Sequence, residues 1–333
     1  MATRRSLHRI GAVFAALLVV VLGAAVAACG SENGSSAKSG EGAGAFPRKI
    51  QHIMGTTEIP AQPKRVVVLD TGELDDVTML GIKPVGAVSP HMKTEGGFPA
   101  YLKDQIGGVK DVGPMEQPNL EMIASLKPDL ILSSKVRHEK VYDRLSAIAP
   151  TVFTETTGGP WKDNLAVHAR ALGLEKQAKD ALTSYEGRAK ALGAAIQKKH
   201  GTMPTASVVR FVAGPTRLYQ RSTFSGVVLD DIGLKRPASQ SSTDPKATML
   251  NVSPEQIDKA DADLIFVATA VAPDKTQRQD VTSNPLWKEL RAVRDGKVFE
   301  VPDETWMSGI GVQAGEHMLA DVAKATGTQL PKK

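Results

Sequence analysis

The chain has 333 residues, 41% of them hydrophobic, and a formal net charge of +5 at pH 7. Most of the excess positive charge lies at the start of the chain, because residues 1–28 contain three arginines and no acidic residue. Without residues 1–28 the formal net charge is +2. The chain has no run of Lys and Arg with interleaved aromatic side chains, so its composition excludes the usual pattern of a nucleic-acid-binding protein. About 290 residues remain for an ordered body, which suits two domains better than one small domain.

The first 28 residues have the pattern of a secretory signal peptide. Arg4 and Arg5 provide a basic start, residues 10–28 carry no charge, and small side chains precede Cys29. A transmembrane anchor is the alternative, since about 18 apolar residues can just span a bilayer. The arginine pair fits either the general secretion route or twin-arginine export. We therefore predict a signal peptide at 1–28 and a protein that works outside the cytoplasm.

Cys29 is the only cysteine of the chain and lies at the predicted cleavage point. The sequence Val26-Ala27-Ala28-Cys29 resembles the lipobox of bacterial lipoproteins, and this resemblance implies cleavage before Cys29 and attachment of lipid to its sulfur. No disulfide is then possible, so stability must come from a packed core. Residues 29–45 are rich in Gly, Ser and Ala, which indicates a flexible tether to the membrane.

Residues 46–160 are predicted to form an N-terminal α/β lobe. Short apolar runs rich in β-branched residues alternate with helical patterns, which is typical of a parallel sheet with crossover helices. The predicted strands lie at 65–69, 84–88, 129–133 and 151–153, and the predicted helices at 74–80, 119–126 and 142–148.

Residues 161–200 are predicted to form a helical linker that contains one long interdomain helix at 175–199. At 1.5 Å per residue this helix would span roughly 37 Å, about the diameter of a small domain. Its apolar residues recur at spacings of three or four, as expected for one buried face. They are Ala178, Leu182, Tyr185, Ala189, Leu192 and Ile196.

Residues 201–333 are predicted to form a C-terminal α/β lobe. The predicted fold class is therefore α/β, with two Rossmann-like lobes joined by one long rigid α-helix. A ligand would bind in the cleft between the lobes. In this second lobe we expect strands at 207–212, 263–267 and 297–301, and helices at 224–232, 254–260, 286–290 and 315–326.

Four stretches, in this order and spacing, carry a family resemblance. They are Gly55–Gly86 with its run Pro63-Lys64-Arg65-Val66-Val67-Val68-Leu69, Pro118–Val152 with Pro118-Asn119-Leu120-Glu121, Val209–Leu234, and Trp306–Leu319. Together they resemble the solute-binding proteins of ABC importers that have a single interdomain helix, specifically the iron–siderophore branch.

The resemblance implies a receptor rather than an enzyme. Its ligand would be a ferric siderophore that keeps the iron coordinated, with no cofactor, and its partners the permease subunits of an ABC importer driven by a cytoplasmic ATPase. The chain itself has no P-loop of the form GxxxxGK[ST]. We expect a monomer that closes only modestly, because the single helix acts as a stiff hinge.

A ferric siderophore presents oxygen acceptors and apolar chain on its outer surface. A receptor should therefore offer Arg or Tyr donors and aromatic walls, since the planar guanidinium donates to paired oxygens and stays charged. The candidate ligand-binding residues are Arg137, Arg210, Arg217, Tyr219, Arg221 and Trp306.

Four of these candidates lie on or just after the predicted strand 207–212. Arg210 lies within the strand, where a buried arginine needs either the cleft or a carboxylate partner. Arg217, Tyr219 and Arg221 follow at alternating positions and share one face if the segment is extended. The alternative for these three is a solvated hairpin face.

The other two candidates follow predicted strands elsewhere. Arg137 comes after the strand 129–133, and the carboxyl ends of parallel strands line the ligand crevice. Trp306 lies between the last strand and the last helix, where it would form either a cleft wall or part of the lobe core. Met115 falls near the position at which ferric-hydroxamate binders carry an arginine, so their ligand chemistry does not transfer directly.

Glu121 and Glu255 form a different pair, one in each lobe. Each lies in the first turn of a predicted helix, where an acidic side chain stabilises the helix N-terminus, and residues 253–256 have the pattern of a capping box. The family resemblance implies that these two glutamates dock with arginines of the permease.

Other functions are compatible with this scaffold. Haem or cobalamin binding on the same fold is the main alternative. Capture of a bare metal ion needs about three histidines and a carboxylate that converge, and the histidines are scattered. An enzyme is less favoured, because no G-x-S-x-G, CxxC or HExxH motif occurs. The segment Gly309–Ala314 matches a loose dinucleotide fingerprint but lies too close to the end for the βαβ unit it needs.

Overall fold

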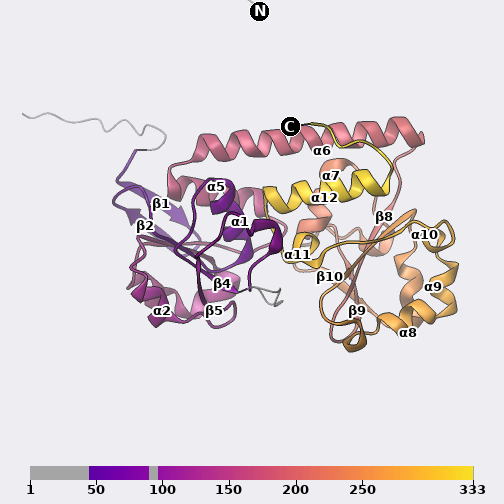
Figure 1. The fold of residues 1–333 in the computed structure, drawn as a ribbon, viewed down its shortest axis with the longest axis horizontal. Coiled ribbons are helices and arrows are strands. Elements are labelled where there is room, and N and C mark those ends of the chain that lie inside the picture. The colour runs from indigo at the N-terminus through magenta and orange to yellow at the C-terminus, as the bar shows by residue number, and fades with distance from the viewer. Residues whose placement is uncertain (1–44, 90–96, 333) are drawn as a thin grey trace, which may run out of the picture. The chain divides into compact units, whose positions relative to one another are not determined.

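The fold begins with an antiparallel hairpin, β1 (Arg48–His52) and β2 (Gly55–Ile59). The computed structural model describes residues 45–89 and 97–332 (Figure 1). Cys29, the predicted signal peptide and almost all of the predicted tether lie outside the described residues. None of the helices in the described part of the chain combines the length and apolar character needed to cross a bilayer.

The N-terminal sheet has five strands in the order β5-β4-β3-β6-β7, and all four pairings are parallel. The central strand β3 pairs through Val67 with Gly86 and through Val66 with Leu130. The predicted parallel sheet is therefore confirmed. The strands are β3 (Val66–Val68), β4 (Gly86–Ser89), β5 (Lys110–Pro114), β6 (Leu130–Ser134) and β7 (Thr151–Thr154).

Short helices follow these strands and cover the sheet. Asp70 caps the first of them, α1, by accepting a hydrogen bond from the backbone N–H of Thr71 at 2.6 Å. The helices of this lobe are α1 (Thr71–Met79), α2 (Leu120–Ser125), α3 (Lys135–His138) and α4 (Tyr142–Ser146), with the 3₁₀ helices η1 (Ala100–Leu102) and η2 (Glu139–Val141).

The C-terminal sheet has the order β10-β9-β8-β11-β12 and is mixed. β8, β11 and β12 are parallel, but β9 runs antiparallel to both β8 and β10. The sequence patterns predict only the parallel strands, because β9 and β10 have four residues each and little apolar alternation. The strands are β8 (Ala206–Phe211), β9 (Thr216–Tyr219), β10 (Met249–Val252), β11 (Leu264–Thr269) and β12 (Val298–Glu300).

The helices of the C-terminal sheet include two predicted segments with altered form. The segment 254–260 is a 3₁₀ helix, η4, rather than an α-helix, and 286–290 is found as α9, shifted by one residue. The helices are α7 (Phe224–Ile232), α8 (Arg278–Ser283), α9 (Pro285–Glu289), α10 (Arg291–Arg294), α11 (Asp303–Trp306) and α12 (Val312–Ala325), with η3 (Ala238–Gln240), η4 (Pro254–Ala260) and η5 (Pro273–Lys275).

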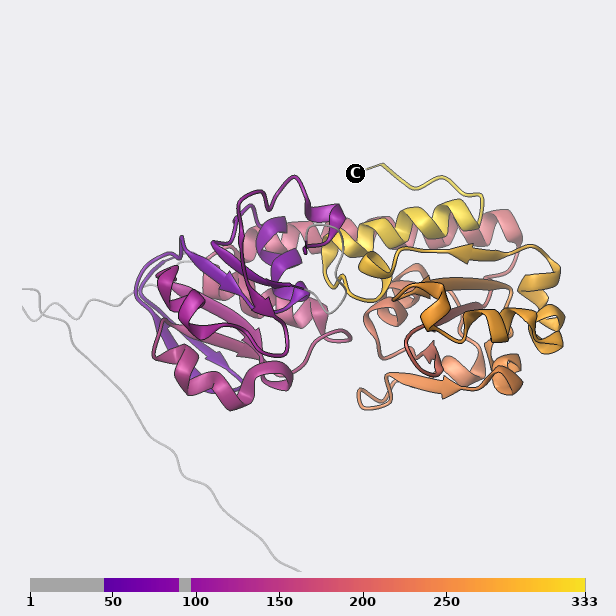
Figure 2. The same cartoon turned by 60° about the horizontal axis from the view of Figure 1, so that its bottom comes forward.

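The long helix α6 (Glu175–His200) follows α5 (Trp161–Leu172) and confirms the predicted interdomain helix. It packs against α5, α7 and α12, so it contacts helices that belong to both sheets (Figures 1 and 2). Gly193 lies where α6 crosses α7, and a Cβ atom there would come within 1.9 Å of the carbonyl oxygen of Ile232. The two helices can approach this closely only because this residue is glycine.

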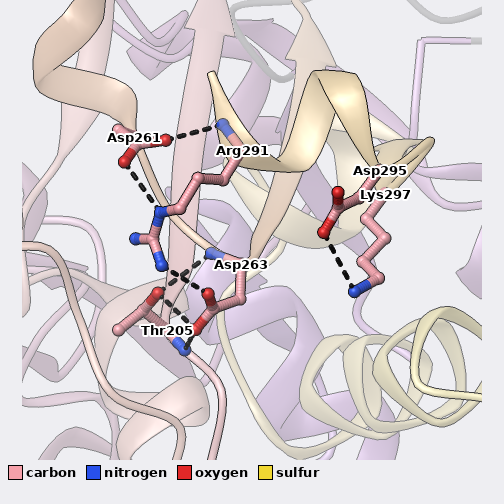
Figure 3. A network of polar contacts seen from close by, with 6 residues as sticks. All are labelled: Thr205, Asp261, Asp263, Arg291, Asp295 and Lys297. Carbon is pink, nitrogen blue, oxygen red and sulfur yellow. Dashed lines mark hydrogen bonds and ion pairs between the residues drawn. The ribbon is translucent and has the colours of Figure 1, made fainter. Parts of the chain in front are cut away.

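The amino end of the C-terminal sheet is fixed by a polar network, shown in Figure 3. Arg291 donates to Asp261 at 2.8 Å and to Asp263 at 2.6 Å. The other oxygen of Asp263 accepts from the backbone N–H and the hydroxyl of Thr205, both at 2.8 Å. This network holds the start of β8 beside the start of β11.

The N-terminal sheet starts in the same way. Asp129, directly before β6, accepts from the backbone N–H groups of Lys64 and Arg65, both at 2.8 Å. Asp263 has the matching place directly before β11. Because the amino ends of both sheets are fixed in this way, the loops that can vary lie at the carboxyl ends of the strands, where ligands bind in such sheets.

Candidate ligand-binding pocket

A cavity of about 510 Å³ lies at the carboxyl ends of the strands of both sheets. Four of the six predicted ligand-binding residues line it, and they come from both lobes. The lining residues are Asp70, Thr71, Met115, Arg137, Arg210, Val212, Ala213, Arg217, Tyr219, Met249, Ala270, Val271, Met307, Ser308 and Ile310.

Arg210, on β8, is fixed in a bidentate ion pair. Its Nε and Nη2 donate to the two carboxylate oxygens of Asp303 at 2.6 and 2.7 Å, and its Nη1 donates to the hydroxyl of Tyr219 at 2.9 Å. Burial opposes the charged form of Arg210, but the Asp303 carboxylate outweighs it and raises the pKa. Arg210 therefore has a carboxylate partner and also lines the pocket, while its contact with a ligand stays a prediction.

Arg217, on β9, lies opposite Arg210 in the antiparallel β8–β9 pair. Two like charges at directly opposed positions destabilise a sheet unless something compensates them. Asp303 compensates Arg210, but in the described residues Arg217 has no hydrogen bond or ion pair, and its Nε is buried without a partner. Arg217 is thus a guanidinium that is available to an anion in the pocket.

Arg137, on α3, supplies the cation on the N-terminal side. Its Nε donates to Asp70 Oδ2 at 2.8 Å, and the Asp70 side chain is only 1% exposed. The adjacent His138 fixes this short helix, because its Nε2 lies 2.6 Å from the carbonyl oxygen of Met115 and its Nδ1 lies 2.7 Å from the hydroxyl of Ser133. Burial lowers the pKa of His138, so its neutral form makes both contacts.

Arg221 does not line the pocket, contrary to its selection as a candidate. It lies beyond the end of β9 and forms an ion pair with Asp230 on α7, with nearly half of its side chain exposed. The alternation of Arg217, Tyr219 and Arg221 does not persist, because β9 ends at Tyr219.

Trp306 does not line the pocket either, and the expected cleft wall must be corrected. The residue is fully buried, its ring packs on Phe266 with centroids 4.5 Å apart, and its Nε1 donates to Asp321 at 2.8 Å. The alternative interpretation, lobe core, describes its place. The next two residues, Met307 and Ser308, are the ones that reach the cavity.

Several pocket residues were not predicted. Asp70 carries a sequence signal, since a lone aspartate directly after a buried strand lies at the carboxyl edge of the sheet. Asp303 holds Arg210 without lining the pocket itself, and it carries no such signal, because its pairing with Arg210 joins residues 93 positions apart. The three methionines Met115, Met249 and Met307 provide flexible, polarisable apolar surface.

Glu121 and Glu255 are both exposed, on the first turns of α2 and η4. The predicted capping box is present, with Ser253 and Gln256 in reciprocal contact. Hydrogen bonds from its own backbone N–H and from the Ser253 hydroxyl lower the pKa of Glu255. Each glutamate precedes the aspartate at the base of its sheet by eight residues in sequence, so the two occupy equivalent positions.

No group of three or more His, Cys, Asp or Glu side chains is placed to hold a metal ion anywhere in 45–89 and 97–332. The polar side chains that line the pocket are donors on arginine, tyrosine, threonine and serine, together with the Asp70 carboxylate, which Arg137 already engages. Such a set can bind the oxygen surface of a complex that brings its own metal ligands.

Comparison with known proteins agrees with this geometry. The family model described as periplasmic binding protein matches residues 66–305. The chain belongs to the periplasmic binding protein family. The family expected from the sequence and the two-lobed α/β fold are thus both confirmed.

Among relatives of this binding protein is a probable siderophore-binding lipoprotein of Bacillus subtilis, YfiY, which is 40% identical over 324 residues and aligns over 94% of this chain and 96% of its own. The achromobactin-binding periplasmic protein of Dickeya dadantii is 32% identical over 80% of this chain and 87% of its own. These names are those of binding proteins, which confirms the prediction of a binding protein rather than an enzyme.

A solved structure gives the same picture. Staphylococcus aureus SirA, in its complex with staphyloferrin B, is 38% identical to this chain and superposes with a TM-score of 0.78, covering 85% of this chain and all of SirA.

Proposed function

We propose that this periplasmic binding protein captures a ferric siderophore in the pocket lined by Arg137, Arg210, Arg217 and Tyr219. The observation that carries the proposal is the opposed pair Arg210–Arg217, in which only Arg210 has a carboxylate partner. The names of the relatives support it, since they refer to siderophores or to the binding of achromobactin.

The ligand would be held by its outer oxygens, while its own donor atoms keep the iron. Arg217 would donate to an anionic oxygen, because charge-assisted hydrogen bonds from guanidinium to carboxylate are short and strong. Arg137 and Arg210 would use donor groups that Asp70 and Asp303 leave free. The methionines would pack against the apolar part of the ligand.

The pocket favours an anionic, carboxylate-bearing ferric siderophore over a flat aromatic ligand. Three guanidinium groups line it, but among the described residues its only aromatic side chain is that of Tyr219, which is 9% exposed. Ligands such as haem are usually held between broad apolar and aromatic walls. The described lining offers little surface of that kind.

Delivery to a permease would use Glu121 and Glu255, one at each matching position of the two lobes. Both carboxylates are exposed and lie outside the ligand pocket, so they are free for a cationic partner. A lipid on Cys29 and a tether at 29–45 would keep a monomeric receptor beside its permease outside the cytoplasm, at high effective concentration. The lobe boundaries 46–160 and 201–333, with the linker 161–200, belong to the same proposal.

A titration panel tests this function. The mature protein is titrated with ferric citrate, a ferric hydroxamate, a ferric catecholate, haem, cobalamin and bare Zn²⁺, and binding is followed by calorimetry. We expect heat from a ferric carboxylate complex and none from the iron-free chelator at equal concentration. Tight binding of haem, cobalamin or bare metal ion, with no response to any ferric chelate, would contradict the proposal.

A further inference from the structure

Arg137 stands at one end of a chain of polar contacts that runs through the floor of the pocket. Its Nε donates to Asp70 Oδ2 at 2.8 Å, and Asp70 Oδ1 accepts from the backbone N–H of Thr71 at 2.6 Å. Asp70 and Thr71 are 1% and 4% exposed. Because water has almost no access to these groups, each contact orients its neighbour more strongly than a surface contact would.

Arg210 stands at the other end of the chain. It donates twice to Asp303, and Asp303 Oδ2 also accepts from the hydroxyl of Ser308 at 3.0 Å. The backbone N–H of Ser308 donates to the carbonyl oxygen of Asp303 at 3.0 Å. Trp306 lies between these two residues in sequence and is buried. Its Nε1 donates a hydrogen bond to Asp321, which anchors the segment to α12.

The two ends are joined by a hydrogen bond in which the hydroxyl of Thr71 donates to the carbonyl oxygen of Ser308 at 2.5 Å. Further along α1, Asp75 accepts from the backbone N–H groups of Gln313 and Ala314, both at 3.0 Å. Glycine makes this close approach possible. A Cβ atom at Gly309 would lie 2.4 Å from the carbonyl oxygen of Glu304, and one at Gly311 would lie 2.4 Å from Asp75 on α1. The glycine-rich segment that matches a loose dinucleotide fingerprint thus allows α11 to pack against α12, and α12 against α1.

We propose that Asp70, Thr71, Ser308 and Asp303 are positioning residues that couple the orientation of Arg137 to that of Arg210. The inference rests on the proposed function in that these two arginines are taken as ligand contacts. Holding both guanidinium groups in place before a ligand arrives lowers the entropy lost on binding. The hydroxyl group of Thr71 carries this coupling between the two arginines, beside the hydrogen bonds that hold Asp75 to the start of α12.

The test uses the mature protein without ligand, so its outcome is independent of the titration panel. Nitrogen-15 NMR measures the exchange of each arginine Nε–H with water, and Arg137→Lys and Arg210→Lys assign the two signals. Thr71→Val keeps the side-chain shape but removes the hydroxyl. We expect exchange to speed up about fivefold at both arginines, the factor that corresponds to one net hydrogen bond.

Three further variants sharpen the result. Thr71→Ser restores the hydroxyl and should return both signals to wild-type exchange. Thr305→Val is the matched control, because the hydroxyl of Thr305 donates only to Pro302 within its own lobe. Ser308→Ala removes the hydroxyl contact to Asp303 but keeps the backbone carbonyl that accepts from Thr71, so it loosens the segment from the other side. It should speed up exchange at Arg137 as well as at Arg210. A change confined to the arginine nearest each substitution, or no change at all, overturns the proposal.

Discussion

All four strand pairings of the N-terminal sheet are parallel, whereas in the C-terminal sheet β8 turns directly back into the antiparallel strand β9. A parallel neighbour needs a crossover connection, but a hairpin brings side chains of nearby residues to within about 5 Å of one another. The hairpin therefore places Arg217 and Tyr219 beside Arg210, while the described part of the N-terminal lobe contributes one guanidinium, that of Arg137. The shared architecture provides the platform, and the one antiparallel strand concentrates the ligand donors on one side.

The two lobes carry Glu121 and Glu255 at equivalent positions. Substitution of these two residues is expected to have the largest effect, and that effect is on iron uptake. Glu121→Arg combined with Glu255→Arg should abolish iron uptake by cells and leave ligand affinity unchanged, because both residues lie outside the pocket and face solvent. Radiolabelled iron uptake and calorimetry measure the two quantities. Glu58→Arg, another exposed charge reversal, is the control. A parallel loss of affinity would show that the glutamates act in the site instead.

The lobes differ in buried acid, since Glu73, Asp75 and Asp76 on α1 are almost fully buried and no carboxylate of the described C-terminal sheet is. Burial, with Asp70 nearby, raises the pKa of Glu73 from 4.5 to about 7. The native state therefore keeps a proton that the unfolded state releases, and the free energy of unfolding should fall as pH rises from 4.5 to about 7.

The substitution Glu73→Gln removes this loss of unfolding free energy at rising pH. At pH 8 the variant should be more stable than the wild type by on the order of 3 kcal/mol, and at pH 4.5 the two should be nearly equal. Urea unfolding at several pH values measures the difference. The exposed Glu121→Gln serves as control and should follow the wild-type profile. Equal slopes in the wild type and Glu73→Gln would contradict the assignment.

A substitution of Arg217 tests whether the β8–β9 hairpin provides the main anion contact of the pocket. Arg217→Gln should weaken binding of a ferric carboxylate siderophore by about 2 kcal/mol, the usual worth of a hydrogen bond to a charged group. Arg221→Gln, two positions past the end of β9 and outside the pocket, should leave affinity within about 0.5 kcal/mol of wild type. If the two variants behave alike in calorimetry, the hairpin does not provide the main anion contact.

Trp306 is expected to give the smallest effect on binding. Trp306→Phe keeps an aromatic ring against Phe266 but loses the hydrogen bond to Asp321, which should lower stability by about 1–2 kcal/mol. Ligand affinity should stay near wild type, since Trp306 is fully buried. Thermal unfolding and calorimetry separate these quantities, and a large loss of affinity at unchanged stability would restore the cleft-wall interpretation.

Long periodic patterns were the predictable part of the fold. The interdomain helix and all parallel strands except β5 could be predicted from spacing, because each pattern is repeated over several residues and each has a period of its own. β9 and β10 could not, since a strand of four residues is too short for an alternation to stand out. The pairing β9 needs is set by the fold rather than by its own composition.

The site was predictable wherever position along a strand fixes direction. Arg137 and Arg210 follow or end buried strands, and the carboxyl edge of a parallel sheet places them at the pocket. The positions of Arg221 and Trp306 outside the pocket could not be predicted in this way. They depend on where β9 ends and on which face of α11 is buried. The role of Asp303 could not be predicted from the sequence, since only the folded chain brings it to Arg210.

The ion pairs of the pocket affect which solutes the receptor retains when no siderophore is bound. Asp70 and Asp303 neutralise Arg137 and Arg210, so Arg217 is the only uncompensated charge among these five residues. A small free anion can engage that single guanidinium in competition with water, and gains little. A large complex that fills the cavity and reaches all three arginines gains much more. The receptor can therefore stay vacant among abundant phosphate or free citrate and remain available for a scarce iron-loaded ligand.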